Sequence, residues 1–248
     1  MFEFMTVREL YEICRADNAV ETDNVEYVEL EGWVRTNRDS GKVGFIALND
    51  GSYFRNCQVV YLEDKLKNFN DVAHIATGSA IHVLGKLKIT PDAKQPFEVE
   101  ATEIILEGDC DSDYPLQKKR HSFEFMREIP HLRPRANTFY AIFRLRSVLS
   151  MAIHEFFQSQ GFIYVHTPII TCADCEGSAE MFKLTTLDLD KDLPQKDGKT
   201  DFSEDLFGKK AYITGSGQLH GETFAAAFGK IYTFGPTLRS ENSNTKTH

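Results

Sequence analysis

Five short runs rich in β-branched and aromatic residues, all between Val25 and Gly108, constrain the fold of this chain more than any other feature. They read VEYVELEGWV, VGFIALND, NCQVVYL, AIHVLGKLKI and PFEVEATEIIL, and the rough alternation of apolar and polar residues in them is typical of strands. Turn-forming stretches punctuate the runs, and EDKLKNFNDVAHIA, after the third run, has helical spacing. Five strands with a helix after the third predict a small Greek-key barrel of the OB-fold type, although another small barrel fits the pattern nearly as well.

A helix is predicted before the barrel and a hinge after it. Thr6 and Glu9 form a capping box, which predicts a short helix that ends near Asp17. The stretch EGDCDSDYPLQKKR changes from acidic to turn-like to basic, as a hinge does. We therefore divide the chain into a barrel domain with its helix (1–108), a hinge linker (109–135) and a second domain (136–248).

The second domain is predicted to mix helices and strands. A helix begins at Asn137 or Thr138 and ends at Gly161. Its apolar face carries Ile142, Leu145, Leu149, Ile153 and Phe156. FIYV is strand-like, and AYITGSGQL and KIYTFGP are expected to be buried strands on either side of the apolar helix ETFAAAFG. The polar segment 185–208 has no apolar period, which indicates a surface insertion or a flexible loop.

Composition excludes several classes of protein. The formal net charge of −9 argues against a protein that coats nucleic acid without selectivity. A local basic stretch nevertheless exists between Gln117 and Arg146, with eight cations against two anions. The five cysteines form no dense framework and are expected to be reduced thiols of a cytosolic protein. No run of about 18 apolar residues exists, so no membrane span or membrane partner is expected.

The end of the chain, FGPTLRSENSNTKTH, holds Arg239 and Glu241 two residues apart. On a strand, this spacing places a planar cation and an acceptor on the same side. Such a pair can hold a phosphate together with an amino-bearing ring, and its alternative use is a salt bridge.

These motifs resemble those of class II aminoacyl-tRNA synthetases of the aspartyl/asparaginyl group. FGPTLRSENSNT is similar to motif 2 of that class, and GFIYVHTPII is similar to motif 1. HLRPRANTF, PIITCADCEGSAEMF, TTLDL and DLFGKKAYITGSGQL follow the asparaginyl members of the group. GWVR, GFIALND and CQV resemble the anticodon-binding OB-fold of the same group. The resemblance covers essentially the whole chain and implies an OB-fold barrel followed by the first part of the class II antiparallel-sheet catalytic domain.

The resemblance implies a role for each matching residue of the second domain. Arg239 would hold the α-phosphate of ATP and Glu241 the amino group of adenine, as the catalytic and ATP-binding pair. His248 would lie near the outer phosphates, although this chain has Thr247 where the group usually has arginine. The amino-acid pocket would comprise Glu176, Ser216 and Gln218, with Glu180 and Glu222 as further candidates.

In the barrel, the resemblance implies an anticodon-binding surface. Phe45 would stack on a base, and Gln58 would read the central uracil of the anticodon, because its amide offers both a donor and an acceptor. Arg38 and Arg35 would hold phosphates or bases nearby.

The implied partners are L-asparagine, ATP and tRNA(Asn), with a homodimer formed through motif 1. The resemblance also implies that asparagine is preferred to aspartate. Aspartyl members place a lysine three residues after the position of Gln218, whereas this chain has Gly221, which offers no cation to a substrate carboxylate. Motif 3 and the acidic ligands of Mg²⁺ are absent from the sequence, so we expect an N-terminal fragment that stops within motif 2 and is inactive alone.

Other interpretations remain open at this point. The chain could be an aspartyl-tRNA synthetase, or a non-catalytic RNA-binding protein in which the second domain only dimerises. An ammonia-using asparagine synthetase with the same catalytic fold is a third alternative, but such proteins lack the OB domain. Cys172 and Cys175 form one CxxC without a second pair of ligands, so no metal site is expected.

Overall fold

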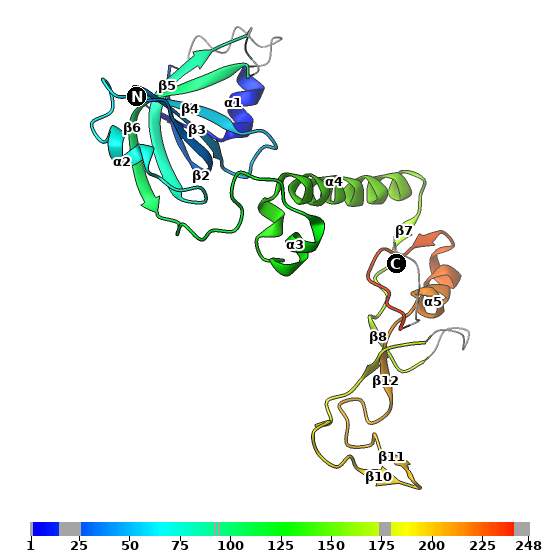
Figure 1. Ribbon diagram of the computed structural model, residues 1–248. Helices are drawn as coiled ribbons and strands as arrows, with labels where there is room; N and C mark the ends of the chain where they lie inside the picture. The colour runs from blue at the N-terminus through cyan, green and yellow to red at the C-terminus, as the bar shows by residue number, and fades with distance from the viewer. Residues whose placement is uncertain (1, 15–25, 92, 94, 174–179, 241–248) are drawn as a thin grey trace. The chain divides into compact units, whose positions relative to one another are not determined.

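The computed structural model describes residues 2–14, 26–91, 93, 95–173 and 180–240 of the chain. They belong to two compact units, 1–145 and 146–248, which are taken separately below (Figure 1). Among the described residues, none of the helices is long and apolar enough to cross a membrane.

Unit 1 begins with the predicted helix. Strand β1 (Glu3–Phe4) precedes helix α1 (Val7–Ile13). The capping box is confirmed: the hydroxyl of Thr6 accepts from the backbone N–H of Glu9 at 3.3 Å, and Oε2 of Glu9 accepts from the backbone N–H of Thr6 at 2.7 Å. The helix ends at Ile13, and the predicted end near Asp17 lies outside the described residues.

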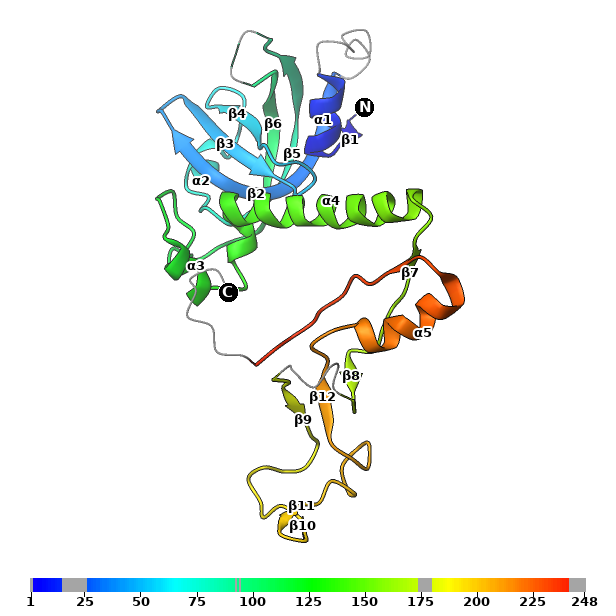
Figure 2. The same ribbon diagram turned by 90° about the vertical axis from the view of Figure 1, so that its right-hand side faces the viewer.

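The five predicted strands form a closed barrel, as expected for an OB-fold. They are β2 (Tyr27–Asp39), β3 (Val43–Asn49), β4 (Cys57–Leu62), β5 (Ala80–Ile89) and β6 (Phe97–Gly108). Their order is β2-β3-β4-β6-β5, and a further pairing of β5 with β2 closes the sheet (Figures 1 and 2). The helix after the third strand, α2 (Phe69–Ala73), is shorter than the stretch with helical spacing.

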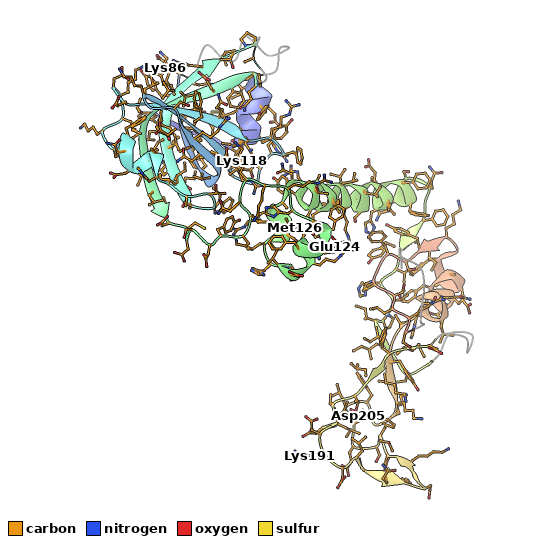
Figure 3. The ribbon with its side chains drawn as sticks, viewed as in Figure 1. Lys86, Lys118, Glu124, Met126, Lys191 and Asp205 are labelled. Carbon is orange, nitrogen blue, oxygen red and sulfur yellow. The ribbon has the colours of Figure 1, made fainter. Side chains whose placement is uncertain are left out.

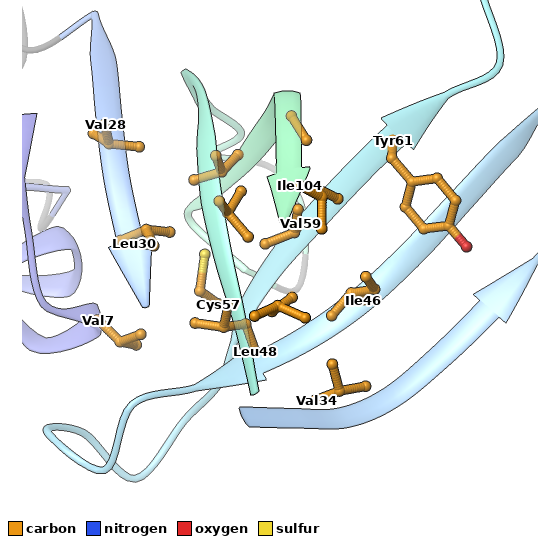
Figure 4. Packing of buried hydrophobic residues seen from close by; sticks show 14 of the residues in the cluster. Val7, Val28, Leu30, Val34, Ile46, Leu48, Cys57, Val59, Tyr61 and Ile104 are labelled. Carbon is orange, nitrogen blue, oxygen red and sulfur yellow. The ribbon is translucent and has the colours of Figure 1, made fainter. Parts of the chain in front are cut away.

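The core of unit 1 fills this barrel. Alternate residues of each strand point inward, which is why the burial pattern of β5 switches at every step. Figure 4 shows side chains from several strands, among them Val28, Ile46 and Val59, converging on one interior. Tyr61 is fully buried in this core, and its hydroxyl donates to Oδ1 of Asn37 at 2.9 Å. Burial raises the pKa of Tyr61 to about 12, so it stays protonated as a donor.

Glycine is required opposite that tyrosine. Gly44 pairs with Tyr61 across β3 and β4, and a Cβ at Gly44 would lie 1.9 Å from the tyrosine ring. The side chain of Asn37 also donates to the carbonyl of Val72 at 2.7 Å, which fastens α2 to the barrel.

The segment after the barrel is partly helical. Helix α3 (Phe123–Glu128) is capped by Ser122, and a short 3₁₀ helix (Arg133–Arg135) follows it. The hydroxyl of Tyr140 donates to the carbonyl of Gly51 at 2.8 Å, and Arg144 donates to the same carbonyl at 3.0 Å. Arg144, which belongs to the basic stretch, therefore stabilises the fold of unit 1.

Helix α4 (Asn137–Ser159) confirms the predicted long helix, and the division between the two units falls within it. Its end is marked by Gly161 at φ +77°, a conformation that glycine adopts without strain. None of its residues is buried. In unit 2 its apolar side chains are largely exposed: Val148 by 68%, Leu149 by 54% and Phe156 by 60%.

Unit 2 contains two small sheets and a helix. Strands β8 (Ile170–Thr171), β12 (Ala211–Ile213) and β9 (Lys183–Leu184) form an antiparallel sheet in that order. Strands β7 (Ile163–Tyr164) and β13 (Ile231–Tyr232) pair in parallel, and helix α5 (Gln218–Phe228) contacts β13.

Two predictions about this unit were wrong. The strand expected over 211–219 ends at Ile213, and Gln218 lies in the first turn of α5. The reason is local: just before the N-cap Gly217, the hydroxyl of Ser216 accepts from the backbone N–H of Gln218 at 3.1 Å, which turns the chain out of the extended conformation. Arg239, expected on a strand, lies in an irregular segment at the end of the described chain.

The polar segment 185–208 is an ordered insertion rather than a structureless loop. Strands β10 (Gln195–Lys196) and β11 (Lys199–Thr200) form a hairpin around Asp197 and Gly198, both at positive φ. At the base of this insertion Asp205 is buried, and its Oδ1 accepts from the backbone N–H (2.9 Å) and the hydroxyl (2.7 Å) of Thr186 (Figure 3).

Candidate active site and nucleic-acid interface

In unit 2, a continuous series of hydrogen bonds joins the segment of Arg239 to the start of α5. The backbone N–H of Leu238 donates to the carbonyl of Thr214 at 3.1 Å, and the hydroxyl of Thr214 donates to the carbonyl of Ser216 at 2.6 Å. The hydroxyl of Ser216 accepts from the N–H of Gln218, as described above. Three predicted site residues, Arg239, Ser216 and Gln218, are thus linked through neighbouring backbone groups.

Arg239 is exposed, and the chain is held on both sides of it. Leu238 bonds to Thr214, and the N–H of Ser240 donates to the carbonyl of Glu180 at 2.7 Å. A guanidinium carried on a fixed backbone is suited to an anionic ligand. Three other predicted site residues, Glu176, Glu241 and His248, lie outside the described residues.

The first turns of α5 carry the remaining candidates of this site. Nε2 of Gln218 donates to Oε1 of Glu222 at 3.2 Å, and both side chains are exposed. Gly221 between them is buried, and a Cβ there would lie 3.4 Å from Cδ1 of Ile231 and 4.0 Å from Cγ2 of Thr233. A longer side chain at Gly221 would therefore begin against β13.

A hollow of unit 2 adjoins the same backbone. It shares Thr214 and Gly217 with the hydrogen-bonded series, and Thr167, Thr233 and Thr237 contribute to its lining. Its wall therefore offers threonine hydroxyl groups to a ligand, together with the imidazole of His166.

On the barrel, three of the four predicted anticodon-binding residues share one outer face. Arg38 of β2 pairs with Phe45 of β3, and Gln58 of β4 pairs with Ala47, two residues further along β3. Paired residues and residues two apart along a strand point to the same face. Phe45 is half-buried, whereas its neighbour Ile46 is fully buried in the core. Phe45 is therefore on the outside of the barrel.

Gln58 is also restrained by a neighbouring strand. Its Nε2 donates to Oε2 of Glu98 on β6 at 3.4 Å. Further along β6, Glu100 forms ion pairs with Lys65 and Lys88, whose hydrogen bonds lower the pKa of the Glu100 carboxyl.

Arg35, the fourth predicted residue, is engaged within unit 1. Its guanidinium donates to the backbone carbonyl of Arg135 and to Oδ1 of Asn137, the latter at 3.3 Å. Burial lowers the pKa of Arg35. These contacts fasten the end of the 3₁₀ helix and the start of α4 to the barrel.

No group of three or more His, Cys, Asp or Glu side chains within the described ranges could hold a metal ion. Cys172 is an exposed thiol, and its CxxC partner Cys175 lies outside those ranges.

Sequence reasoning missed the pairing of Gln218 with Glu222, and it missed Glu98 altogether. The four-residue spacing of Gln218 and Glu222 would have indicated their contact, had the helix been predicted to start at Gln218. Glu98 is brought to Gln58 by the parallel pairing of β4 with β6, which no local pattern signals.

Comparison with known proteins matches both halves of the chain. Residues 122–248 match the family of tRNA synthetases class II (D, K and N), and residues 28–107 match the OB-fold nucleic acid binding domain. The asparagine–tRNA ligase of Alkaliphilus oremlandii is 59% identical over 221 residues, covering 89% of this chain and 48% of the relative. That of Acetivibrio thermocellus is 58% identical with the same coverage. The chain thus spans about half the length of these curated relatives.

Solved structures give the same picture. The asparaginyl-tRNA synthetase of Pyrococcus horikoshii, complexed with asparaginyl-adenylate, is similar with a TM-score of 0.76 and 25% identity, over 100% of this chain and 51% of that one. A putative aspartyl-tRNA synthetase from Leishmania major is similar in fold, with a TM-score of 0.69 and 21% identity, over 98% of this chain and 44% of that one.

The barrel and the sheet-and-helix unit together define a class II aminoacyl-tRNA synthetase architecture. Within that class, the chain belongs to the family of tRNA synthetases class II (D, K and N), and it is a homologue of asparagine–tRNA ligases.

Proposed function

We propose that the protein carrying this chain is an asparagine–tRNA ligase. It would activate L-asparagine with ATP to form asparaginyl-adenylate and transfer the asparaginyl group to the 3′ end of tRNA(Asn), in the cytoplasm. The single observation that carries the proposal is the hydrogen-bonded series that links Arg239 to Ser216 and Gln218. The identity of 59% with an asparagine–tRNA ligase supports it.

Activation is a displacement at phosphorus. The α-carboxylate of asparagine attacks the α-phosphorus of ATP, the bond to the β-phosphate oxygen breaks, and pyrophosphate leaves with the electron pair. A hydroxyl of the terminal ribose of tRNA then attacks the activated carbonyl, loses its proton and expels AMP. Arg239 would neutralise charge on the α-phosphate, and Ser216, Gln218 and Glu176 would hold the amino acid in line.

Glu241 would contact adenine and His248 the outer phosphates, as further parts of the proposed ATP site. Mg²⁺ would accompany ATP as its usual counter-ion. No residue of this chain is assigned to it.

The outer barrel face would bind the anticodon of tRNA. Phe45 would stack on a base, Gln58 would read the central uracil, and Arg38 would hold the backbone. The placement of all three on one face supports this assignment. The guanidinium of Arg35 is bonded to Arg135 and Asn137. Arg35 would therefore support RNA binding by holding this segment in place.

We propose that the protein prefers asparagine to aspartate because position 221 carries no positive charge. Gly221 supplies no cation, and the space beside it is occupied by Ile231 and Thr233. The side-chain carboxylate of aspartate would lie near the carboxylates of Glu222 and, in the proposed pocket, Glu176. No cation of α5 would pair with it. The fold-level similarity to a putative aspartyl-tRNA synthetase does not bear on this choice.

We also propose that the protein is a homodimer through the motif 1 helix, α4. The exposed apolar side chains of that helix, among them Val148 and Leu149, are the kind of surface that a second copy would cover.

The experiment that tests the proposed site is asparagine-dependent exchange of pyrophosphate into ATP by the full-length gene product. Arg239→Ala is expected to slow exchange by roughly two to three orders of magnitude, as removal of one group that stabilises transition-state charge does. Arg127→Ala, at an arginine whose side chain is 65% exposed, is the control and should leave exchange unchanged. Exchange within about twofold of the unmodified protein in Arg239→Ala would refute the assignment.

A further inference from the structure

The outer face of the barrel that β2, β5 and β6 form carries exposed apolar side chains. Trp33 of β2 is 47% exposed, whereas its neighbour Val34 is buried in the core, and Ile105 of β6 is 39% exposed. Trp33 lies opposite Ala80 of β5, and Ala80 lies opposite Gly108 of β6. Because both residues beside the tryptophan in this row are small, they cannot cover its indole ring.

The carboxylates on and around this face fall into two groups. One group has basic partners: Glu26 pairs with Lys86, Glu29 with His82, and Glu100 with Lys65 and Lys88. The other group comprises Glu31, Glu103 and Glu107, which are exposed and form no ion pair with any described residue. This second group lies beside the apolar side chains, since His82 is opposite both Glu31 and Ile105.

The negative charge continues past the end of β6. Between Gln95 and Gln117 the sequence has seven carboxylates and no lysine or arginine. Three of them, Asp109, Asp111 and Asp113, directly follow the strand and are exposed. The hydroxyl of Ser79, the residue before Ala80, donates to Oδ1 of Asp109 at 3.3 Å, which brings this acidic run beside the row of Trp33.

We propose that this acidic barrel face, comprising Glu31, Trp33, Glu103, Ile105 and Glu107, is a docking surface for a basic amphipathic segment of another protein. The apolar side of the segment would cover Trp33 and Ile105, and its lysines or arginines would pair with the three glutamates. A tryptophan anchor with a polar rim is typical of protein–protein interfaces. RNA does not fit, because the carboxylates would repel its phosphates. The inference does not depend on the function proposed above.

The probe for this surface is a synthetic, fluorescein-labelled helix of about 18 residues, with leucines on one side and lysines on the other. Its binding to the full-length gene product is measured by fluorescence anisotropy. We expect saturable binding that weakens as salt is added, because exposed charges are screened. The same helix with glutamates in place of the lysines should bind at least roughly tenfold more weakly, because like charges would then face each other.

Two variants test the two components of the acidic barrel face. Glu31→Lys/Glu103→Lys/Glu107→Lys should raise the Kd of the lysine helix roughly tenfold or more, because three attractive pairs become repulsive. Trp33→Ala should raise this Kd roughly fivefold or more, as removal of an apolar anchor does. Its effect should persist at high salt, where the charge contribution is screened. Both variants should retain the Tm of the unmodified protein, since all four side chains are exposed.

The matched control is Glu12→Lys/Glu63→Lys/Glu128→Lys, at exposed glutamates elsewhere in unit 1. It changes the net charge by the same amount and should leave the Kd within about threefold of the unmodified value, because distant surface charges are screened.

The outcomes separate this surface from its alternatives. Equal weakening by the two triple variants would show that net charge alone attracts the helix, and would overturn the inference. Absence of saturable binding to the unmodified protein would overturn it too, because the face would then be covered by the rest of the chain or by a second copy. If Trp33→Ala weakened binding of tRNA instead of the lysine helix, the face would be an RNA site and the proposed partner would be wrong.

Discussion

Phe45 of β3 lies directly opposite Arg38 of β2 on the outer face of the barrel, while its neighbour Ile46 is fully buried inside. Adjacent residues of one strand thus divide between surface and core. This division allows RNA binding and barrel stability to be tested at neighbouring positions.

Phe45→Ala is expected to weaken tRNA binding without slowing asparagine activation. Loss of one base–aromatic stack costs about 1–3 kcal/mol, so affinity in a filter-binding titration should fall roughly five- to 150-fold. Ile46→Ala is the contrast: it should lower the free energy of unfolding by about 2–5 kcal/mol, as core truncations do. Unchanged tRNA affinity in Phe45→Ala would refute the proposed stacking role.

Leu149→Lys is expected to produce a monomer. Leu149 is 54% exposed on α4, and a lysine there would place a charge in the proposed two-fold interface at both symmetry-related positions. Light scattering after size-exclusion chromatography gives the molar mass directly. Glu155→Lys, on the same helix but outside its apolar set, should remain dimeric; an unmodified protein that is already monomeric would contradict the dimer.

Glu100 should contribute to barrel stability in a pH-dependent way. Hydrogen bonds from Lys65 and Lys88 lower the pKa of its carboxyl below the ordinary 4.5. A lowered pKa in the folded state stabilises the fold above the unfolded pKa, and this stability is lost as pH falls through the folded pKa. Glu100→Gln should therefore lower Tm at pH 7, and the difference from the unmodified protein should shrink below about pH 4.5.

The control for that measurement is Glu103→Gln, at an exposed residue of the same strand. It should show a smaller Tm difference at pH 7. A Tm difference for Glu100→Gln that stays constant between pH 7 and pH 3 would contradict the ionic contribution.

Asp205 should hold the insertion 185–208 together. Hydrogen bonds from the Thr185 hydroxyl and from the N–H and hydroxyl of Thr186 lower the pKa of its carboxyl, and the N–H of Leu206 donates to it at 2.8 Å. Asp205→Ala should raise amide hydrogen exchange across 185–208, because these donors lose their acceptor. Asp205→Asn keeps an acceptor oxygen and should have a much smaller effect. Equal exchange in Asp205→Ala and the unmodified protein would show that the insertion is held by other contacts.

The barrel could be predicted from sequence because its strands alternate roughly between apolar and polar residues, most regularly in β5, where buried and half-buried residues alternate. The start of α5 could not, because GSGQ reads as the end of a strand until the hydroxyl of Ser216 is known to bond to Gln218. The hairpin inside the predicted insertion was missed for a different reason. Its Asp197-Gly198 pair is a strong hairpin signal, but the flanking strands are two residues each and have no apolar period.

Sequence predicted only those residues of the candidate site that lie in motifs shared with the class II synthetases. Arg239, Ser216 and Gln218 were found in that way, and their linkage through Thr214 required the fold. Arg35 shows the limit of such reasoning: its resemblance to an RNA-binding arginine gave no sign of its contact with Arg135, 100 residues away in sequence.

The most direct test of the whole account is the choice between asparagine and aspartate. Pyrophosphate exchange by the full-length gene product, measured with each amino acid at equal concentrations, should run with asparagine and be slower by at least about a hundredfold with aspartate, since a mismatched buried polar group is costly. Exchange that runs faster with aspartate would contradict the assignment.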